Sequence, residues 1–132
     1  MTYTIETSLG KGETSLALLK VIAENSFDSI LVTDATIEGK VIYANKAFEN
    51  LTGHDPSEVI GQTPRILQGI GTDTKVIDRL TDAMKSGNDF EGKAINYKKD
   101  GTPFIMYWRV LPIKTGETIE AWVAIQREGS SI

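Results

Sequence analysis

The spacing of apolar residues changes along this chain, from helical in its middle to extended near its C-terminal end. The clearest helix runs from about 74 to 86, where one apolar stripe lies between a predicted N-cap at Asp73 and a terminal Gly87. Residues 14–25 predict another helix with one broad apolar side, after a polar arm over residues 1–13. The pattern thus predicts one helix ahead of the main folded unit and one inside it.

Shorter elements lie between these two helices. Two apolar triplets, 30–32 and 41–43, predict the strands of a hairpin. Asn45 is the predicted N-cap of a short helix that ends at Gly53, and Pro56 starts a further helical turn. This stretch therefore supplies two strands and several short helices.

The C-terminal part of the chain predicts three consecutive strands. Residues 90–99 and 102–113 are extended segments on either side of an Asp-Gly turn at 100–101. A second turn at 114–117 leads to a last strand over 118–127. The order of elements predicts an α+β fold class, with a five-stranded antiparallel sheet and helices segregated on one face.

The last two strands are apolar on both of their faces, which is unusual for a sheet with one side in water. We expect the face with even numbers to meet the helices and any ligand. The face with odd numbers then needs another cover, for which the helix over 14–25 is the candidate and a second subunit the alternative. The even positions are Phe104, Met106, Trp108, Val110, Trp122, Ala124 and Gln126, and the odd positions include Ile105, Tyr107, Leu111, Ile119, Val123 and Ile125.

Composition restricts the functions that this fold can serve. The 132 residues fit one domain, and the net charge of -4 argues against a nucleic-acid partner. No apolar stretch reaches the ~20 residues that span a bilayer, and the N-terminal residues lack the pattern of a secretion signal. The chain has no cysteine and one histidine, and it lacks a phosphate-binding loop motif. We therefore expect a cytoplasmic domain that is not an enzyme and has no catalytic or metal site.

Five fragments of the chain, all in order, resemble PAS domains of the light-oxygen-voltage (LOV) kind. Residues 61–69 (GQTPRILQG) are similar to the family's G-x-N-C-R-F-L-Q-G signature. Residues 96–104 (NYKKDGTPF) are similar to its N-Y-x-K-D-G-x-x-F hairpin. The other fragments are VTD at 32–34, YANKAF with LTG between 43 and 53, and WVAIQ at 122–126.

This resemblance implies one PAS sensor domain over residues 26–128, preceded by an arm and a flanking helix at 1–25 and followed by a tail at 129–132. The flanking helix is then expected on the face of the sheet opposite to the other helices. The expected partners are a second copy of the chain, bound through that outer sheet face and the helix, and an effector domain or partner protein. No nucleic acid or membrane is expected as a partner.

The resemblance also implies a flavin pocket, with FMN as the expected cofactor and FAD or riboflavin as alternatives. Arg65 and Gln68 match residues that bind the phosphate and the ribityl chain. Asn96 matches a residue at the polar edge of the flavin ring, and Gln126 matches one near its reactive nitrogen. The other implied pocket residues are Thr33, Thr63, Leu67, Met106, Trp108 and Trp122.

Several of these positions depart from the family's pattern. Pro64 stands where the family has its photoreactive cysteine, so no thiol adduct can form. Met106 replaces an asparagine and cannot donate a hydrogen bond, and Thr81 replaces an arginine. Trp108 and Trp122 replace smaller aromatic residues, and together they can fill much of a ring-sized cavity.

Two functions from different classes are therefore open. In the first, which we favour because four polar matches are retained together, the domain is a flavin sensor of blue light or redox state. It would work by photoreduction without a thiol adduct. In the second, it is a ligand-free dimerisation and signal-relay module of a multidomain receptor. A different small ligand in the same cavity is a third possibility. Separately, Glu58 and Lys99 match two residues that form a salt bridge at the mouth of the family's pocket.

Overall fold

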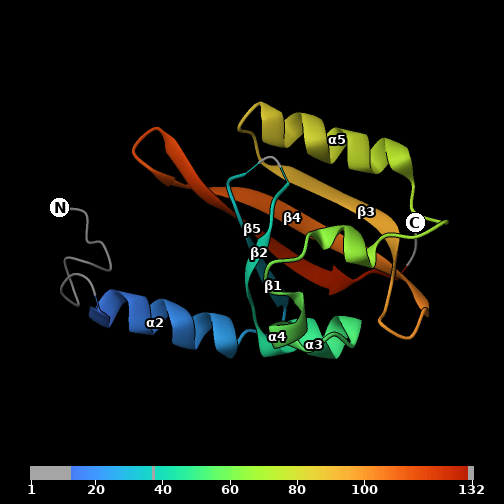
Figure 1. Cartoon of the computed structure of the whole chain (residues 1–132), viewed down its shortest axis with the longest axis horizontal. Helices are drawn as coiled ribbons and strands as arrows, with labels where there is room; N and C mark the ends of the chain where they lie inside the picture. The colour runs from blue at the N-terminus through green and yellow to red at the C-terminus, as the bar shows by residue number, and fades with distance from the viewer. Residues whose placement is uncertain (1–12, 37, 131–132) are drawn as a thin grey trace.

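Strands from both ends of the described chain join one antiparallel sheet in the order β2-β1-β5-β4-β3 (Figure 1). The computed structural model describes residues 13–36 and 38–130. The α+β class and the five antiparallel strands predicted from the sequence are confirmed. The elements are α2 (Glu13–Glu24), β1 (Ser29–Asp34), β2 (Val41–Ala44), α3 (Lys46–Thr52), α4 (Pro56–Val59), a 3₁₀ helix (Pro64–Leu67), α5 (Thr74–Lys85), β3 (Phe90–Tyr97), β4 (Pro103–Thr115) and β5 (Thr118–Glu128).

The last strand of the chain is the middle strand of the sheet, because β5 pairs with β1 on one side and β4 on the other. Its Gln126 lies opposite Ser29 of β1 and Trp108 of β4. Residues close to the two ends of the domain therefore meet in one row across the sheet.

Local signals start and stop the helices where the sequence predicts. Asp73 caps α5 by accepting a hydrogen bond from the Lys75 N–H at 2.9 Å. Asn45 caps α3 by accepting from the Phe48 N–H at 3.0 Å, and α3 ends at Gly53, whose φ of 79° is left-handed. Each cap satisfies a main-chain group that the helix itself leaves unpaired.

The core lies between the inner face of the sheet and the helices α3, α4 and α5. In β4 and β5 the even-numbered residues 104–110 and 122–126 point into it as predicted, and α5 packs along β3 (Figure 1). Its apolar stripe is half-buried against the core. The strand residues at the centre of the core are Phe104, Met106, Trp108, Val110 and Trp122, each 1–7% exposed.

The helix α2 is not on the outer face of the sheet, so that part of the expectation is wrong. It extends away from the domain (Figure 1), and four of its apolar side chains are 51–68% exposed. Hydrogen bonds at its last turn fix this direction: Tyr43 Oη donates to Glu24 Oε1 at 2.6 Å, and Asn45 Nδ2 donates to the Ala23 carbonyl at 2.8 Å. The exposed side chains are Leu16, Leu19, Val21 and Ile22.

The predicted arm at 1–13 and the end of the predicted tail fall almost entirely outside the described residues. Among the helices that are described, none is long and apolar enough to cross a membrane.

Candidate functional site

A small cavity lies between α5 and the inner face of the sheet, with a volume of about 70 Å³. Leu80 and Met84 of α5 and Pro64 of the 3₁₀ helix form one wall. The strands form the other wall, which consists of Leu31, Thr33, Trp108, Val110, Trp122, Ala124 and Gln126. Four of the predicted cofactor-binding residues therefore line one space: Thr33, Trp108, Trp122 and Gln126.

The two tryptophans occupy much of the sheet surface around this cavity. Trp108 and Trp122 are each 5% exposed. The Trp108 ring centroid is 5.2 Å from that of Phe90, at an interplanar angle of 49°, which is a favourable aromatic contact. Trp122 lies opposite Thr33 of β1. Both indoles are thus core side chains, and they fill volume that a ring-shaped ligand would need.

Gln126 is buried with half of its amide unpaired. Its side chain is 3% exposed, and its Oε1 accepts a hydrogen bond from Ser29 Oγ at 2.9 Å. Among the described residues, none accepts a hydrogen bond from its Nε2. Since no fully enclosed side-chain nitrogen or oxygen of the described residues lacks a partner, this Nε2 keeps some accessible surface. The Gln126 amide therefore retains the capacity to donate a hydrogen bond.

Asn96 is satisfied by the protein itself. Its side chain is 5% exposed, and with Nδ2 turned toward the main chain it donates to the Leu67 and Ile95 carbonyls at 3.2 Å each. The opposite orientation places Nδ2 3.2 Å from Met106 Sδ. Leu67 and Met106 are 2% and 1% exposed. These three predicted site residues form a packed cluster that does not line the cavity.

The other predicted residues lie on the segment around the 3₁₀ helix. Thr63 is the N-cap of that helix but makes no capping hydrogen bond with its side chain. Arg65 is exposed and Gln68 half-buried, and none of the three lines the cavity. The structure therefore brings together four of the predicted cofactor-binding residues and leaves the rest outside that space.

Six residues of the cavity wall were not among the predicted site residues: Leu31, Pro64, Leu80, Met84, Val110 and Ala124. The apolar stripe of α5 was evident in the sequence, but its spacing alone could not tell which residues of the stripe face the cavity.

The predicted ion pair between Glu58 and Lys99 is confirmed. Lys99 Nζ lies 2.7 Å from Glu58 Oε2 and 2.9 Å from Oε1, and the pair joins α4 to the β3–β4 hairpin. This hydrogen bond lowers the pKa of the Glu58 carboxyl, whereas burial lowers the pKa of the nearby His54. The two side chains of the pair are 52% and 44% exposed, so the pair adds little stability.

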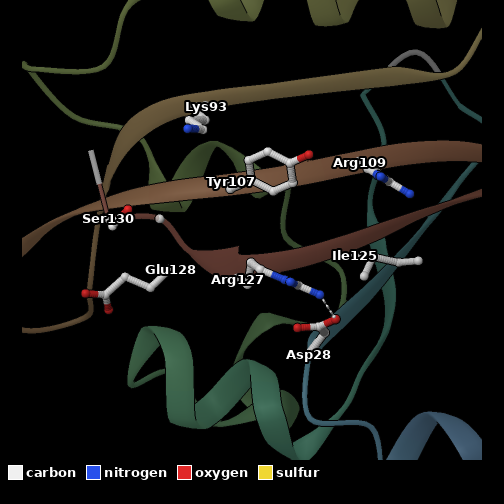
Figure 2. A pocket seen from close by; sticks show the side chains of 9 residues that line it. Asp28, Lys93, Tyr107, Arg109, Ile125, Arg127, Glu128 and Ser130 are labelled. Carbon is white, nitrogen blue, oxygen red and sulfur yellow. Dashed lines mark hydrogen bonds and ion pairs between the residues drawn. The ribbon is translucent and has the colours of Figure 1, made fainter. Parts of the chain in front are cut away.

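A larger and shallower hollow of about 620 Å³ lies on the outer face of the sheet (Figure 2). Its charged side chains are paired: Arg127 with Asp28 at 2.7 Å, and Arg109 with Glu91 at 2.7 Å. A hydrogen bond from Tyr107, with Arg109 beside it, lowers the pKa of the Glu91 carboxyl. The hollow on the outer face is therefore bordered by paired charges.

With its side chains packed in this arrangement, the internal cavity is too small for a flavin. Pockets for ligands of drug or cofactor size measure about 300–1,000 Å³, whereas this cavity measures about 70 Å³. The amide expected at the polar edge of the ring, that of Asn96, already bonds within the protein.

Comparison with known proteins gives consistent matches. A family model described as PAS domain matches residues 28–130. Phototropin-1A of Oryza sativa subsp. japonica is 41% identical over 87 residues, which are 65% of this chain and 9% of that protein. A blue-light-activated histidine kinase of Brucella anthropi is 39% identical over 87 residues, which are 65% of this chain and 18% of that protein. The chain thus corresponds to a small part of the length of these relatives.

A solved structure, the LOV domain from a blue-light activated histidine kinase of Erythrobacter litoralis, superimposes with a TM-score of 0.75 at 31% identity. The match covers 79% of this chain and 97% of that structure. The sheet order, the signature around the 3₁₀ helix and these matches agree. The chain therefore belongs to the PAS family and is a LOV-type sensory signalling domain, one that lacks the photoreactive cysteine.

Proposed function

We propose that this LOV-type domain, with its sensor unit at residues 26–128, works as a signal-relay and dimerisation module whose internal pocket is filled by its own side chains. The observation that carries this proposal is the cavity of about 70 Å³, less than the ~300 Å³ at the lower end for ligand pockets. Trp108 and Trp122 take the space, and Asn96 is satisfied by main-chain oxygens.

The proposed dimer uses α2 and the outer face of the sheet. Four apolar side chains of α2 are more than half exposed, although helices of this kind normally bury their apolar side. On the outer sheet face, Val32, Val123 and Leu111 lie in one row across β1, β5 and β4. Packing α2 of one copy against this row of another would bury both apolar surfaces. An effector domain or partner protein would then respond to the formation of the dimer.

A charge placed on α2 tests the dimer. Leu19→Glu should shift the molar mass measured by light scattering from that of a dimer to that of a monomer. The matched control Lys20→Glu adds the same residue at the neighbouring exposed position and should leave the mass unchanged. A wild-type protein that is monomeric at micromolar concentration would exclude this dimer.

A second candidate, the cysteine-less flavin sensor, is favoured by the joint presence of Arg65, Gln68, Asn96 and Gln126. A bound flavin, with FMN expected first and FAD or riboflavin as alternatives, would supply absorption of blue light and redox chemistry. For it to bind, Trp108 and Trp122 must leave their places and the Asn96 amide must release its main-chain partners. The cytoplasmic location and redox sensing expected from the sequence stay predictions.

The visible absorption spectrum of the purified protein, followed by titration with FMN, separates the two candidates. A colourless protein that takes up no added FMN supports the relay module. Structured bands in the blue that bleach under light and reducing conditions, without a thiol-adduct band, would overturn it in favour of the flavin sensor.

A further inference from the structure

The outer face of the sheet carries two arginines, each oriented by an ion pair with a carboxylate of the protein. Arg127 Nη2 of β5 lies 2.7 Å from Oδ2 of Asp28, which precedes β1. Arg109 Nε of β4 lies 2.7 Å from Glu91 Oε1 of β3. Each ion pair uses one nitrogen of its guanidinium, which has further N–H donors. Since the two arginine side chains are 62% and 60% exposed, both can still donate to a ligand from solution.

The two ion pairs draw these arginines in opposite directions across the sheet. In the strand order β2-β1-β5-β4-β3, Asp28 lies on the β1 side of Arg127, and Glu91 lies on the β3 side of Arg109. The arginines are diagonal neighbours on adjacent strands, because Arg109 is opposite Ile125, two residues before Arg127. Diagonal neighbours are roughly 7–8 Å apart. Two guanidiniums held apart in this way suit two separate acidic groups better than a single one.

The hollow between the two arginines has a partly apolar floor and more cations than carboxylates in its lining (Figure 2). Its volume of about 620 Å³ is within the range of about 300–1,000 Å³ for ligand pockets. Tyr107 lies opposite Arg127, and Ile125 lies opposite Arg109, so an aromatic and an aliphatic side chain form the surface between the guanidiniums. Lys93 Nζ lies 5.8 Å from the centroid of the Tyr107 ring. The charged residues of the lining are Lys93, Arg109, Arg127, Asp28 and Glu128, and Glu128 lies 3.7 Å from Lys98.

We propose that this hollow binds a small dicarboxylate with a short apolar chain, such as glutarate, with one carboxylate on each arginine. A guanidinium matches a carboxylate through two parallel N–H···O bonds. The two carboxylates follow from the two separately held arginines, and the apolar chain follows from Tyr107 and Ile125 beneath it. A compact anion such as phosphate would contact one guanidinium at a time. Asp28 and Glu91 are then positioning residues, because they orient the arginines without contacting the ligand.

This site is separate from the surface proposed for the dimer. Val32, Val123 and Leu111 form the next row of the outer face and do not line the hollow. The inference therefore goes beyond the proposed function and does not depend on it. Binding can be measured on the wild type and on the Leu19→Glu variant, in which the α2 contact is broken.

The test is a titration with glutarate followed by NMR at constant ionic strength. We expect saturable shifts of the Nε–H signals of Arg109 and Arg127 and of the main-chain amides around them, with a dissociation constant in the millimolar range because the hollow is open to solvent. Butyrate has one carboxylate fewer and should bind at least about fivefold more weakly, the worth of one exposed charge pair. Glutaramide, which has the same shape without charge, should cause no saturable shift.

Two charge variants and one control test which residues bind the ligand. Arg109→Gln and Arg127→Gln should each weaken glutarate binding by about fivefold. The matched control Lys114→Gln removes the same charge from an exposed position of β4 outside the hollow and should leave binding unchanged. Equal weakening in all three variants would reduce the effect to general attraction by positive charge, and butyrate binding as tight as that of glutarate would refute the bridging of two arginines. Shifts that fail to saturate in both the wild type and Leu19→Glu would overturn the site, but they would leave the relay module untouched.

Discussion

Replacing Asn45 with alanine removes the most connected buried side chain at the junction of α2, β1 and α3. Asn45 is 0% exposed. Its Oδ1 accepts from the N–H groups of Ile30 and Phe48 at 2.9 and 3.0 Å, and its Nδ2 donates to the carbonyls of Ala23 and Asp28 at 2.8 and 3.1 Å.

The expected loss follows from these four bonds. Removing an N-cap side chain costs about 1 kcal/mol, and each buried main-chain group left unpaired costs about 1–3 kcal/mol more. Two of the four groups keep another partner, since the Phe48 N–H also bonds to the Asn45 carbonyl and the Ala23 carbonyl also accepts from Ser26. We therefore expect a total of at least about 3 kcal/mol, the sum of the cap and of the lower values for the two groups left alone.

Urea denaturation measures this loss. With a slope of about 1.5 kcal/mol per molar urea, the Asn45→Ala midpoint should fall by at least about 2 M. Asn50→Ala is the matched control, because Asn50 lies on the same helix, α3, and is exposed. Asn45→Ala should also increase the rate of amide hydrogen exchange in the last turn of α2 more than in α5. A loss below about 1 kcal/mol, or one equal to that of Asn50→Ala, would refute the reasoning.

Three other changes test the core, the α2 junction and the surface. Trp108→Ala should lower the free energy of unfolding by about 3–5 kcal/mol, because it leaves a cavity in the core; a loss below about 1 kcal/mol in urea would mean that the site collapses freely. Burial and the hydrogen bond to Glu24 raise the pKa of Tyr43. The contribution of this tyrosine to stability is therefore complete below about pH 10. It declines at higher pH, because there the tyrosine ionises more readily in the unfolded chain than in the folded one. Tyr43→Phe should therefore flatten the alkaline fall in melting temperature, and an unchanged profile would contradict this. Lys99→Ala should leave the melting temperature nearly unchanged at any salt concentration, because the pair with Glu58 is exposed; a large salt-dependent drop would show a stronger coupling.

The sequence predicted the elements well because their signals are local. Asp73 lies directly before α5, and Gly87 follows its C-terminal end. The Asp-Gly turn at 100–101 marks the hairpin, and its Gly101 has a φ of 88°. Alternation placed Trp108 and Trp122 on the inner face, because side chains on a strand point to opposite faces in turn. These inferences depend on neighbours a few residues away, and the structure confirms them.

The direction of α2 and the size of the pocket were decided by tertiary structure alone. The apolar side of α2 shows that the helix needs a cover, but Tyr43 and Asn45, which hold its last turn, determine that it points away from the sheet. Likewise, the sequence shows two large indoles facing inward without showing how much space remains. That depends on how closely α5 approaches the sheet. The sequence by itself thus determined the fold, the family and the loss of the cysteine. Long-range packing reduced the pocket to about 70 Å³. The volume of a cavity is a small difference between the large volumes of side chains from several elements, and only the tertiary structure determines it.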